Sequence, residues 1–383
     1  MDFSEILGLD HLKNHLTTSA DRGRIPHAQL FVGSHGSGTL PMAIAYAQYL
    51  LCGNSEGTNQ SGNPSCNKKC NQLVHPDLHF CYPAANNKRV SQKARALDFS
   101  KEWREFVLNS PYGSLFDWYQ YLGIENKQGQ IKLDDAKDIS KSLSLKSYEG
   151  GFKIMVIWHA ELMNNRTANY LLKLIEEPPE KTVFLLLAED ERKILQTIRS
   201  RCQKLEFPPL GERDIQNHLM ERFGLSEPLA QKTAFQADGS YAKALQIINR
   251  QEDDKVFEEW FIDWVRTAFR AKGNKASILK LLSWSENIAK TGRETQKRFL
   301  LYCSGFIRQA LLKNYKADSL VFLEPTTKNF KLENFAPYIH GGNALQINRE
   351  LEKAIYHIER NGNSKIILTD LSIKLTRLLH RKN

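Results

Sequence analysis

The 383-residue sequence lacks any hydrophobic run long enough to cross a membrane. A spanning helix needs about 20 predominantly apolar residues in a row, and no segment of the chain approaches that length. The first residues, Met1 to Glu5, also lack the basic and then apolar pattern of a secretory signal peptide. We therefore expect a cytoplasmic protein without a membrane partner.

Cysteine is scarce, with six residues spread over the whole chain. In a reducing compartment this distribution argues against a disulfide framework and leaves metal binding or simple burial. Internal repeats and extended low-complexity tracts are also missing from the sequence. Together with a hydrophobic content of 41%, these features indicate a globular chain of two or three domains.

Acidic residues are outnumbered by basic ones, because 53 Lys and Arg against 43 Asp and Glu leave a net charge of +10. This balance is compatible with a polyanionic partner such as nucleic acid, and equally with ordinary solubility. One hypothesis is a basic nucleic-acid-binding module in the cysteine loop and the basic and aromatic segment 84–127. Its phosphate contacts would be Lys68, Lys69, Lys88, Arg89 and Arg95. A solvated charged face is the alternative interpretation.

The most informative segment is Gly33-Ser34-His35-Gly36-Ser37-Gly38-Thr39-Leu40, which has the glycine framework of a phosphate-binding loop. In a working loop a lysine reaches the phosphates and a following hydroxyl side chain binds Mg²⁺. Here Thr39 replaces the lysine and Leu40 replaces the hydroxyl residue. The sequence predicts a degenerate loop made of Gly33, Gly36, Gly38 and Thr39, which does not hydrolyse ATP and whose binding of ATP is doubtful.

Continuous apolar runs at 28–32, 154–157 and 183–187 alternate with helical patterns, which is typical of a parallel sheet covered on both faces. Beyond Phe207-Pro208-Pro209 the strand signals stop and helical periodicity continues to the C-terminus. We predict an α/β domain over residues 1–209, with a cysteine-containing insertion at about 52–81. A small helical domain over 210–252 and a larger helical domain over 253–383 follow.

Several motifs resemble one known family. The matching segments are Arg24-Ile25-Pro26-His27-Ala28, His75-Pro76-Asp77-Leu78, Asn169-Tyr170-Leu171-Leu172-Lys173-Leu174-Ile175-Glu176-Glu177-Pro178-Pro179 and Thr197-Ile198-Arg199-Ser200-Arg201-Cys202. They are similar to segments of the delta-prime subunits of bacterial DNA polymerase III clamp loaders, which belong to the AAA+ superfamily. The resemblance covers about the first 210 residues, and the C-terminal region matches only in architecture and length.

The resemblance implies a RecA-like AAA+ domain, a small helical lid and an all-helical collar domain for assembly. The implied partners are the gamma/tau-type ATPase subunits, a delta-type subunit, the sliding clamp and, through the complex, primer-template DNA. Arg201, with Ser200 and Cys202 as its motif neighbours, would act as an arginine finger in the ATP site of an adjacent subunit. The chain itself would be a non-hydrolysing part of the DNA polymerase III holoenzyme.

A second motif bears on hydrolysis. In an active AAA+ ATPase the strand at 154–157 ends in two acidic residues, which support Mg²⁺ and the attacking water. This chain has Trp158 and His159 there, with Glu161 further on. An ATPase with an altered loop and His159 as its base is the alternative, but a base without a metal or a lysine has little to act on.

The resemblance also implies a small zinc module held by four cysteines. Cys52, Cys66 and Cys70 lie in the matching region, so one ligand is missing and the last spacing differs. Structural Zn²⁺ takes four Cys or His ligands, so the fourth would come from His75, His79 or Cys81. The rival interpretation is a degenerate loop with free thiols, and we expect Cys202 and Cys303 to be buried as small hydrophobic residues.

Overall fold

The computed structural model describes residues 1–53, 63–148, 151–249, 252–323, 325–327 and 330–381. It divides into two compact units. The first comprises Met1–Ile124 and Gln128–Ile248, and the second comprises Glu125–Lys127 and Asn249–Asn383. The first unit includes the predicted α/β domain, apart from residues 125–127, together with residues 210–248, so the predicted boundary at 209/210 stays a prediction.

A five-stranded sheet forms the centre of the first unit, with the strand order β2-β3-β4-β1-β5 and parallel pairing throughout. The strands are β1 (Ala28–Gly33), β2 (Leu78–Cys81), β3 (Lys153–Trp158), β4 (Thr182–Ala188) and β5 (Gln203–Phe207). Every residue of β3 and β4 is buried. The predicted α/β class with a parallel sheet is therefore confirmed.

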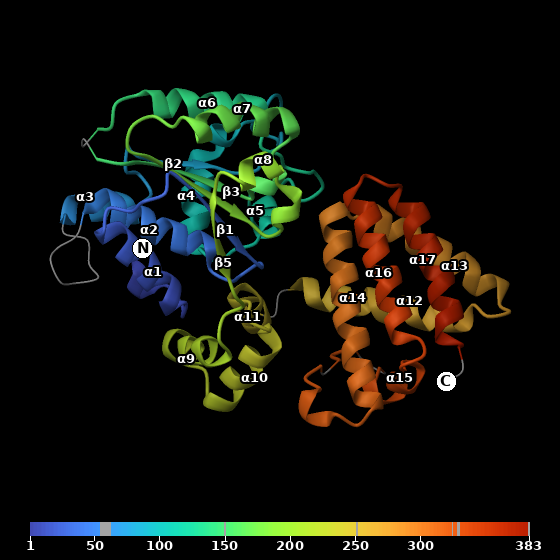
Figure 1. Ribbon diagram of the computed structural model, residues 1–383. Coiled ribbons are helices and arrows are strands. Elements are labelled where there is room, and N and C mark those ends of the chain that lie inside the picture. Colours follow the sequence, from blue (N-terminus) through green and yellow to red (C-terminus); the bar gives the residue numbers. More distant parts are fainter. Residues whose placement is uncertain (54–62, 149–150, 250–251, 324, 328–329, 382–383) are drawn as a thin grey trace. The chain divides into compact units, whose positions relative to one another are not determined.

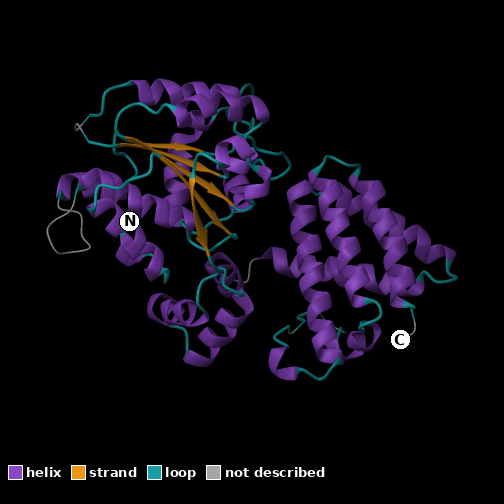
Figure 2. Cartoon of the chain, in the orientation of Figure 1, coloured by secondary structure: helices purple, strands orange, loops and turns teal. Residues whose placement is uncertain are grey.

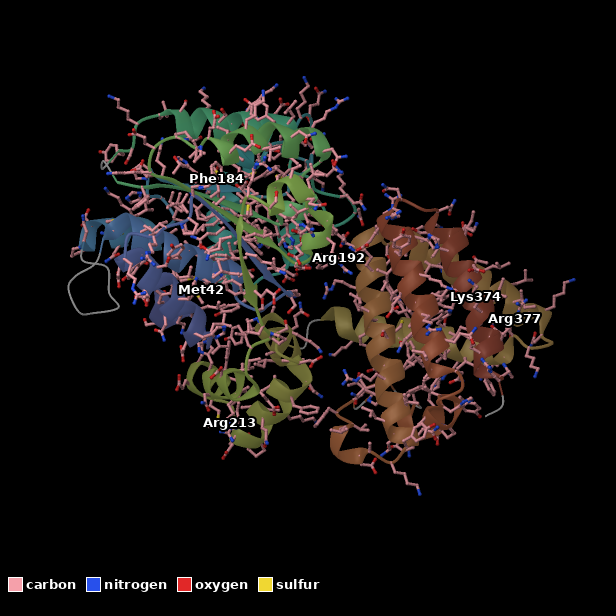
Figure 3. The ribbon with its side chains drawn as sticks, viewed as in Figure 1. Met42, Phe184, Arg192, Arg213, Lys374 and Arg377 are labelled. Atoms are coloured by element: carbon pink, nitrogen blue, oxygen red, sulfur yellow. A yellow bond between two sulfur atoms is a disulfide. The ribbon has the colours of Figure 1, made fainter. Side chains whose placement is uncertain are left out.

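Helices cover the sheet, with α1 and α2 on one side and α6 and α7 on the other (Figure 1). Pro41 lies in the first turn of α2, and α7 ends just before Pro178-Pro179, because proline cannot continue the helical hydrogen bonds. Met42 of α2 and Phe184 of β4 are fully buried in the core (Figure 3). The helices of this unit are α1 (Asp10–Asp21), α2 (Thr39–Cys52), α3 (Pro64–Asn71), α4 (Ser100–Asn109), α5 (Leu115–Leu122), α6 (Leu133–Ser144), α7 (Asn165–Glu176), α8 (Gln196–Arg199), α9 (Glu212–Phe223), α10 (Glu227–Ala237) and α11 (Tyr241–Asn249).

The second unit is helical, as predicted, and all five strands lie in the first unit (Figure 2). Its core includes Trp264, whose ring stacks on Trp284 with centroids 5.0 Å apart and whose Nε1 donates a hydrogen bond to Ser372 Oγ at 2.8 Å. The helices are α12 (Glu252–Arg270), α13 (Lys275–Ala289), α14 (Arg293–Asn314), α15 (Leu332–Phe335), α16 (Ala344–Glu359) and α17 (Ser364–Leu379).

Short 3₁₀ turns complete the described chain: η1 (Phe3–Glu5), η2 (Ala96–Phe99), η3 (Ala160–Leu162), η4 (Glu191–Lys193), η5 (Asp318–Leu320) and η6 (Ala336–Tyr338). Among the described residues, no helix combines the length and apolar character needed to cross a membrane.

Candidate functional site

The glycine loop connects β1 to α2, which begins at Thr39 directly after the loop. Gly36 and Gly38 have φ angles of +76° and +94°, in the left-handed region that glycine adopts without strain. A Cβ atom on Gly36 would lie 2.3 Å from Ser240 Oγ, so the loop backbone is in close contact with the start of α11. The Tyr241 N–H also donates a hydrogen bond to the Gly36 carbonyl at 3.1 Å. The retained glycines thus form a turn that packs against a later helix.

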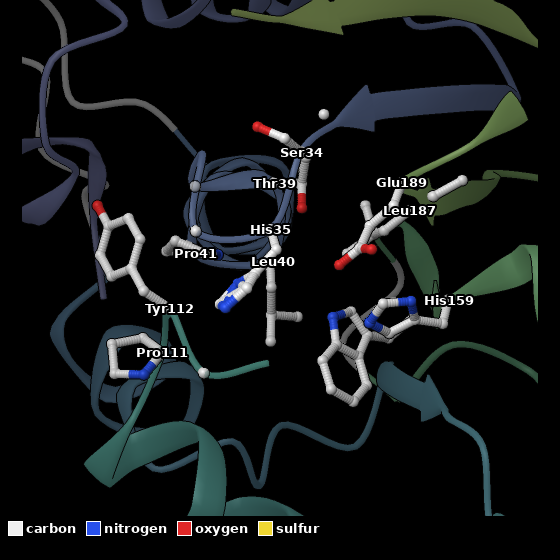
Figure 4. A pocket seen from close by; sticks show the side chains of 16 residues that line it. Ser34, His35, Thr39, Leu40, Pro41, Pro111, Tyr112, His159, Leu187 and Glu189 are labelled. Carbon is white, nitrogen blue, oxygen red and sulfur yellow. The ribbon is translucent and has the colours of Figure 1, made fainter. Parts of the chain in front are cut away.

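The cavity beside this loop is small (Figure 4). Its volume is about 30 Å³, whereas pockets for small molecules are typically about 300–1,000 Å³. Tyr112 forms one wall of the cavity. Its hydroxyl accepts a hydrogen bond from the Leu7 N–H at 3.0 Å. Its ring also meets Tyr241 edge-on, with centroids 4.9 Å apart. These contacts hold Tyr112 against the glycines.

The charge of the cavity is unfavourable for phosphates. Among the described residues that line it there is no lysine or arginine, while Glu189 contributes a carboxylate. Leu40, which replaces the metal-binding hydroxyl residue, is buried and apolar. Phosphate sites in nucleotide hydrolases need a lysine and a metal ion to balance the triphosphate. The cavity therefore lacks the lysine and the metal-binding hydroxyl group of a nucleotide hydrolase, and the absence of ATP hydrolysis stays a prediction.

His159 follows β3 and forms a buried pair with Glu161. The His159 Nδ1 and Glu161 Oε1 atoms are 3.1 Å apart, and Glu161 Oε1 also accepts a hydrogen bond from the Glu189 N–H at 3.1 Å. Burial lowers the pKa of His159, but its hydrogen bond and charge interaction with Glu161 outweigh burial and raise the pKa. Burial raises the pKa of Glu161, but the contact with His159 outweighs burial, so that the pKa of Glu161 is lowered. The pair links the ends of β3 and β4, so His159 is engaged in a structural contact.

Arg201 lies between α8 and the edge strand β5, and its side chain is 39% exposed. One terminal nitrogen, Nη2, lies 2.5 Å from Glu176 Oε1, and Nη1 donates a hydrogen bond to the Thr197 carbonyl at 2.9 Å. Ser200 Oγ donates to the same carbonyl at 3.2 Å. Burial raises the pKa of the Cys202 thiol to about 11, which keeps it protonated near neutral pH. Arg201 is not among the residues that line the glycine-loop cavity.

The three predicted zinc ligands come together in the structure. The ligand sulfurs of Cys52, Cys66 and Cys70 all lie within 4.8 Å of one another, and all three residues are buried. Cys52 and Cys66 are joined by a disulfide, and Cys70 Sγ lies 3.7 Å from Cys52 Sγ. The expectation that the cysteines are unpaired is therefore wrong for this pair, because the end of α2 and the start of α3 bring their Cα atoms to 5.4 Å.

The described residues do not complete a tetrahedral zinc site. Sulfurs joined in a disulfide are not thiolate ligands, and His75, His79 and Cys81 do not belong to the cysteine group. His75 Nδ1 instead accepts a hydrogen bond from the Asp77 N–H at 3.2 Å, while His79 and Cys81 line a separate cavity. Zinc uptake by the reduced chain stays a prediction. Cys303 is buried in the core of the second unit, as expected. The same expectation is wrong for Cys202, which is only partly buried because it lies directly before the edge strand β5.

Comparison with known proteins gives the family. Residues 8–211, more than half of the chain, match the model of the family described as "DNA polymerase III, delta subunit". The chain belongs to this family. Among curated relatives of this DNA polymerase III family member, the delta' subunit of Bacillus subtilis is 29% identical over 209 residues, 54% of this chain and 50% of that protein. The tau/gamma subunit of Haemophilus influenzae is 25% identical over 254 residues, 65% of this chain and 30% of that protein.

The matched region thus spans half or less of the length of these two relatives. A solved DNA polymerase III gamma-subunit-related protein from Thermotoga maritima aligns with 97% of this chain and 99% of its own, at 15% identity and a TM-score of 0.42. That likeness is too distant to carry an argument. Membership of the DNA polymerase III delta family therefore rests on the sequence match over residues 8–211.

Proposed function

We propose that this chain is a non-hydrolysing, delta-prime-type subunit of the clamp loader of a DNA polymerase III holoenzyme. The observation that carries the proposal is the glycine-loop cavity, which is about 30 Å³ in volume and is lined by Glu189 without a lysine or arginine among the described residues. Such a chain would contribute to loading through its neighbours. Its own ATP turnover would be absent.

The proposed contribution is Arg201, supplied as an arginine finger to an adjacent gamma/tau-type ATPase subunit. Arg201 is partly exposed and sits outside the chain's own glycine-loop cavity, as a group that acts in trans must. An arginine finger stabilises the charge that develops on the transferred phosphoryl group. The loader would then act on the sliding clamp at primer-template DNA in the cytoplasm, together with a delta-type subunit.

The second unit has exposed apolar side chains that such an assembly would cover. Large apolar side chains are exposed on α13 and α17, two helices that pack against each other: Ile278, Leu279, Leu282, Ile366 and Ile373. Exposed apolar groups of this kind often mark protein interfaces. They support a collar role for the helices after residue 252.

The alternatives have less support. An altered-loop ATPase would need His159 as a base, yet His159 is buried against Glu161. The nucleic-acid-binding module would need free cations, yet Arg89 lies 2.7 Å from Glu102 and Arg95 lies 3.1 Å from Asp138. Lys69 lies over the Tyr148 ring at 5.6 Å. These contacts neutralise or occupy part of the proposed basic surface.

The decisive experiment measures clamp- and DNA-stimulated ATP turnover in a loader reconstituted from the cognate subunits. Arg201→Ala should lower turnover by at least about tenfold, given the size of arginine-finger effects, while the isolated wild-type chain shows none. The matched control is Arg192→Ala, which removes an exposed arginine that pairs with Asp190 (Figure 3). Size-exclusion chromatography confirms assembly in each case. Unchanged turnover with Arg201→Ala would reduce the subunit's role to a structural one.

A further inference from the structure

Arg201 is held by two contacts within its own chain. Its Nη2 lies 2.5 Å from Glu176 Oε1, and its Nη1 donates to the Thr197 carbonyl at 2.9 Å. A guanidinium group has five N–H donors in one plane. The two contacts engage one donor on each terminal nitrogen and so restrict the orientation of the plane. The side chain is nevertheless 39% exposed. Part of the guanidinium therefore faces outward while the group is anchored from behind.

Both anchors stand on well-packed elements. Glu176 is the last residue of α7, and the preceding Ile175 is fully buried in the core. Thr197 belongs to α8, where the neighbouring Ile198 is also fully buried. The two helices contact each other directly. Groups carried on helices fixed in this way hold a side chain more accurately than a loop does.

We propose that Glu176 is a positioning residue, which holds the Arg201 guanidinium in a defined orientation for the neighbouring ATP site. This proposal rests on the proposed role of Arg201. An arginine side chain has large rotamer freedom, and freedom that must be lost at the transition state slows the reaction. The Glu176 contact removes part of that freedom before the subunits meet.

The weakness of the contact is consistent with this role. Both side chains are more than a third exposed, at 39% and 38%, and ion pairs at such sites stabilise a protein little. The single carboxylate of Glu176, which is exposed to water, therefore competes only weakly for Arg201 with the triphosphate in the neighbouring ATP site. The outward-facing N–H groups of Arg201 can then meet the phosphates while Glu176 and Thr197 hold the other side of the guanidinium.

The test is a double-mutant cycle in the reconstituted loader with Glu176→Ala, Arg201→Ala and both changes together. We expect Glu176→Ala to lower maximal turnover by about threefold to tenfold, a fraction of the arginine's own effect. The KM for ATP should stay unchanged, because ATP binds to the neighbouring subunit. In the Arg201→Ala background, Glu176→Ala should have no further effect.

Two further variants separate positioning from general damage. Glu176→Gln keeps an oxygen that accepts a hydrogen bond from Nη2, so it should recover part of the lost turnover. Glu180→Ala removes an exposed carboxylate just beyond α7 and should leave turnover unchanged. Assembly and the melting temperature of the free subunit are measured for every variant.

The outcomes distinguish the two proposals. If Arg201→Ala leaves turnover unchanged, the arginine-finger role fails, and the role of Glu176 fails with it. If Arg201→Ala lowers turnover but Glu176→Ala does not, only the positioning role is overturned. A rise in turnover with Glu176→Ala would instead make the contact an inhibitory tether. A loss that persists in the Arg201→Ala background would show that Glu176 acts through something else.

Discussion

Replacing Gly36 by alanine tests whether the glycine loop has been retained for packing. At Gly36 the φ angle is +76°, a conformation that costs an L-residue about 1–2 kcal/mol. The added Cβ would also lie 2.3 Å from Ser240 Oγ and 2.9 Å from the Ala242 backbone nitrogen. Relief of such an overlap in a packed region costs about 1–3 kcal/mol more. We therefore expect Gly36→Ala to lower the free energy of unfolding by about 2–5 kcal/mol.

Gly23→Ala is the matched control. Gly23 also has a left-handed φ angle, +66°, but a Cβ there would meet nothing within 4 Å. This variant should lose only the conformational part, about 1–2 kcal/mol, so the difference between the two variants isolates the contact with α11. Thermal denaturation measures the difference, since 1 kcal/mol shifts the Tm of a unit of this size by about 2–4 °C. Hydrogen exchange at the Tyr241 amide, which donates to Gly36, localises it.

Equal losses in the two variants would refute the reasoning. The loop would then not be packed against α11 in solution, and its glycines would have to be explained by something other than that contact. A nucleotide that raised the Tm of the wild-type chain would point to phosphate binding.

Two other predictions concern stability. The pair His159–Glu161 should stabilise the fold within a pH window. Because the pKa of His159 is raised, the stabilisation from His159 is complete below its ordinary pKa of about 6.5 and is lost as the pH rises through the folded value. Because the pKa of Glu161 is lowered, the stabilisation from Glu161 is complete above about 4.3 and is lost as the pH falls through the folded value. Glu161→Gln should therefore reduce the free energy of unfolding most between about pH 4.5 and 6.5, by about 1–3 kcal/mol. Glu180→Gln, at an exposed carboxylate outside the pair, is the control. Urea titrations across pH check this prediction, and a Glu161→Gln effect that is flat from pH 4 to 9 contradicts it. Reduction of the disulfide between Cys52 and Cys66, which are 14 residues apart, should lower the free energy of unfolding by about 3 kcal/mol. A chelator added to the oxidised chain should leave the Tm unchanged. A chelator that lowers the Tm of the reduced chain would instead demonstrate a bound metal.

Sequence patterns predicted the interior of the sheet but not its edges. The strands β3 and β4 are buried along their whole length, so they appear in the sequence as unbroken apolar runs. The edge strand β5 buries only Leu205 and Phe207 among its five residues, and β2 has four residues that include His79. Short edge strands that are half polar carry too little apolar signal to be distinguished from loops.

The candidate site was predictable in part. The sequence itself shows that Thr39 replaces a lysine and that Trp158 and His159 replace acidic residues. All three residues line the cavity. Tyr112 closes the same cavity from a distant segment without periodicity, so nothing in the sequence marked it. Glu176, the partner of Arg201, lies in the motif that ends in Pro178-Pro179, but only the packing of α7 against α8 reveals the contact.

The contact between Gly36 and Tyr241 has a consequence for how this subunit responds to the energy state of the cell. A ligand stabilises a folded protein in proportion to the logarithm of its concentration over its dissociation constant. If the proposed function is correct, a chain whose loop is already bonded to its own Tyr241, beside a cavity of about 30 Å³, would gain nothing of this kind from nucleotide. Its conformation would then be the same in nucleotide-depleted and nucleotide-rich cells.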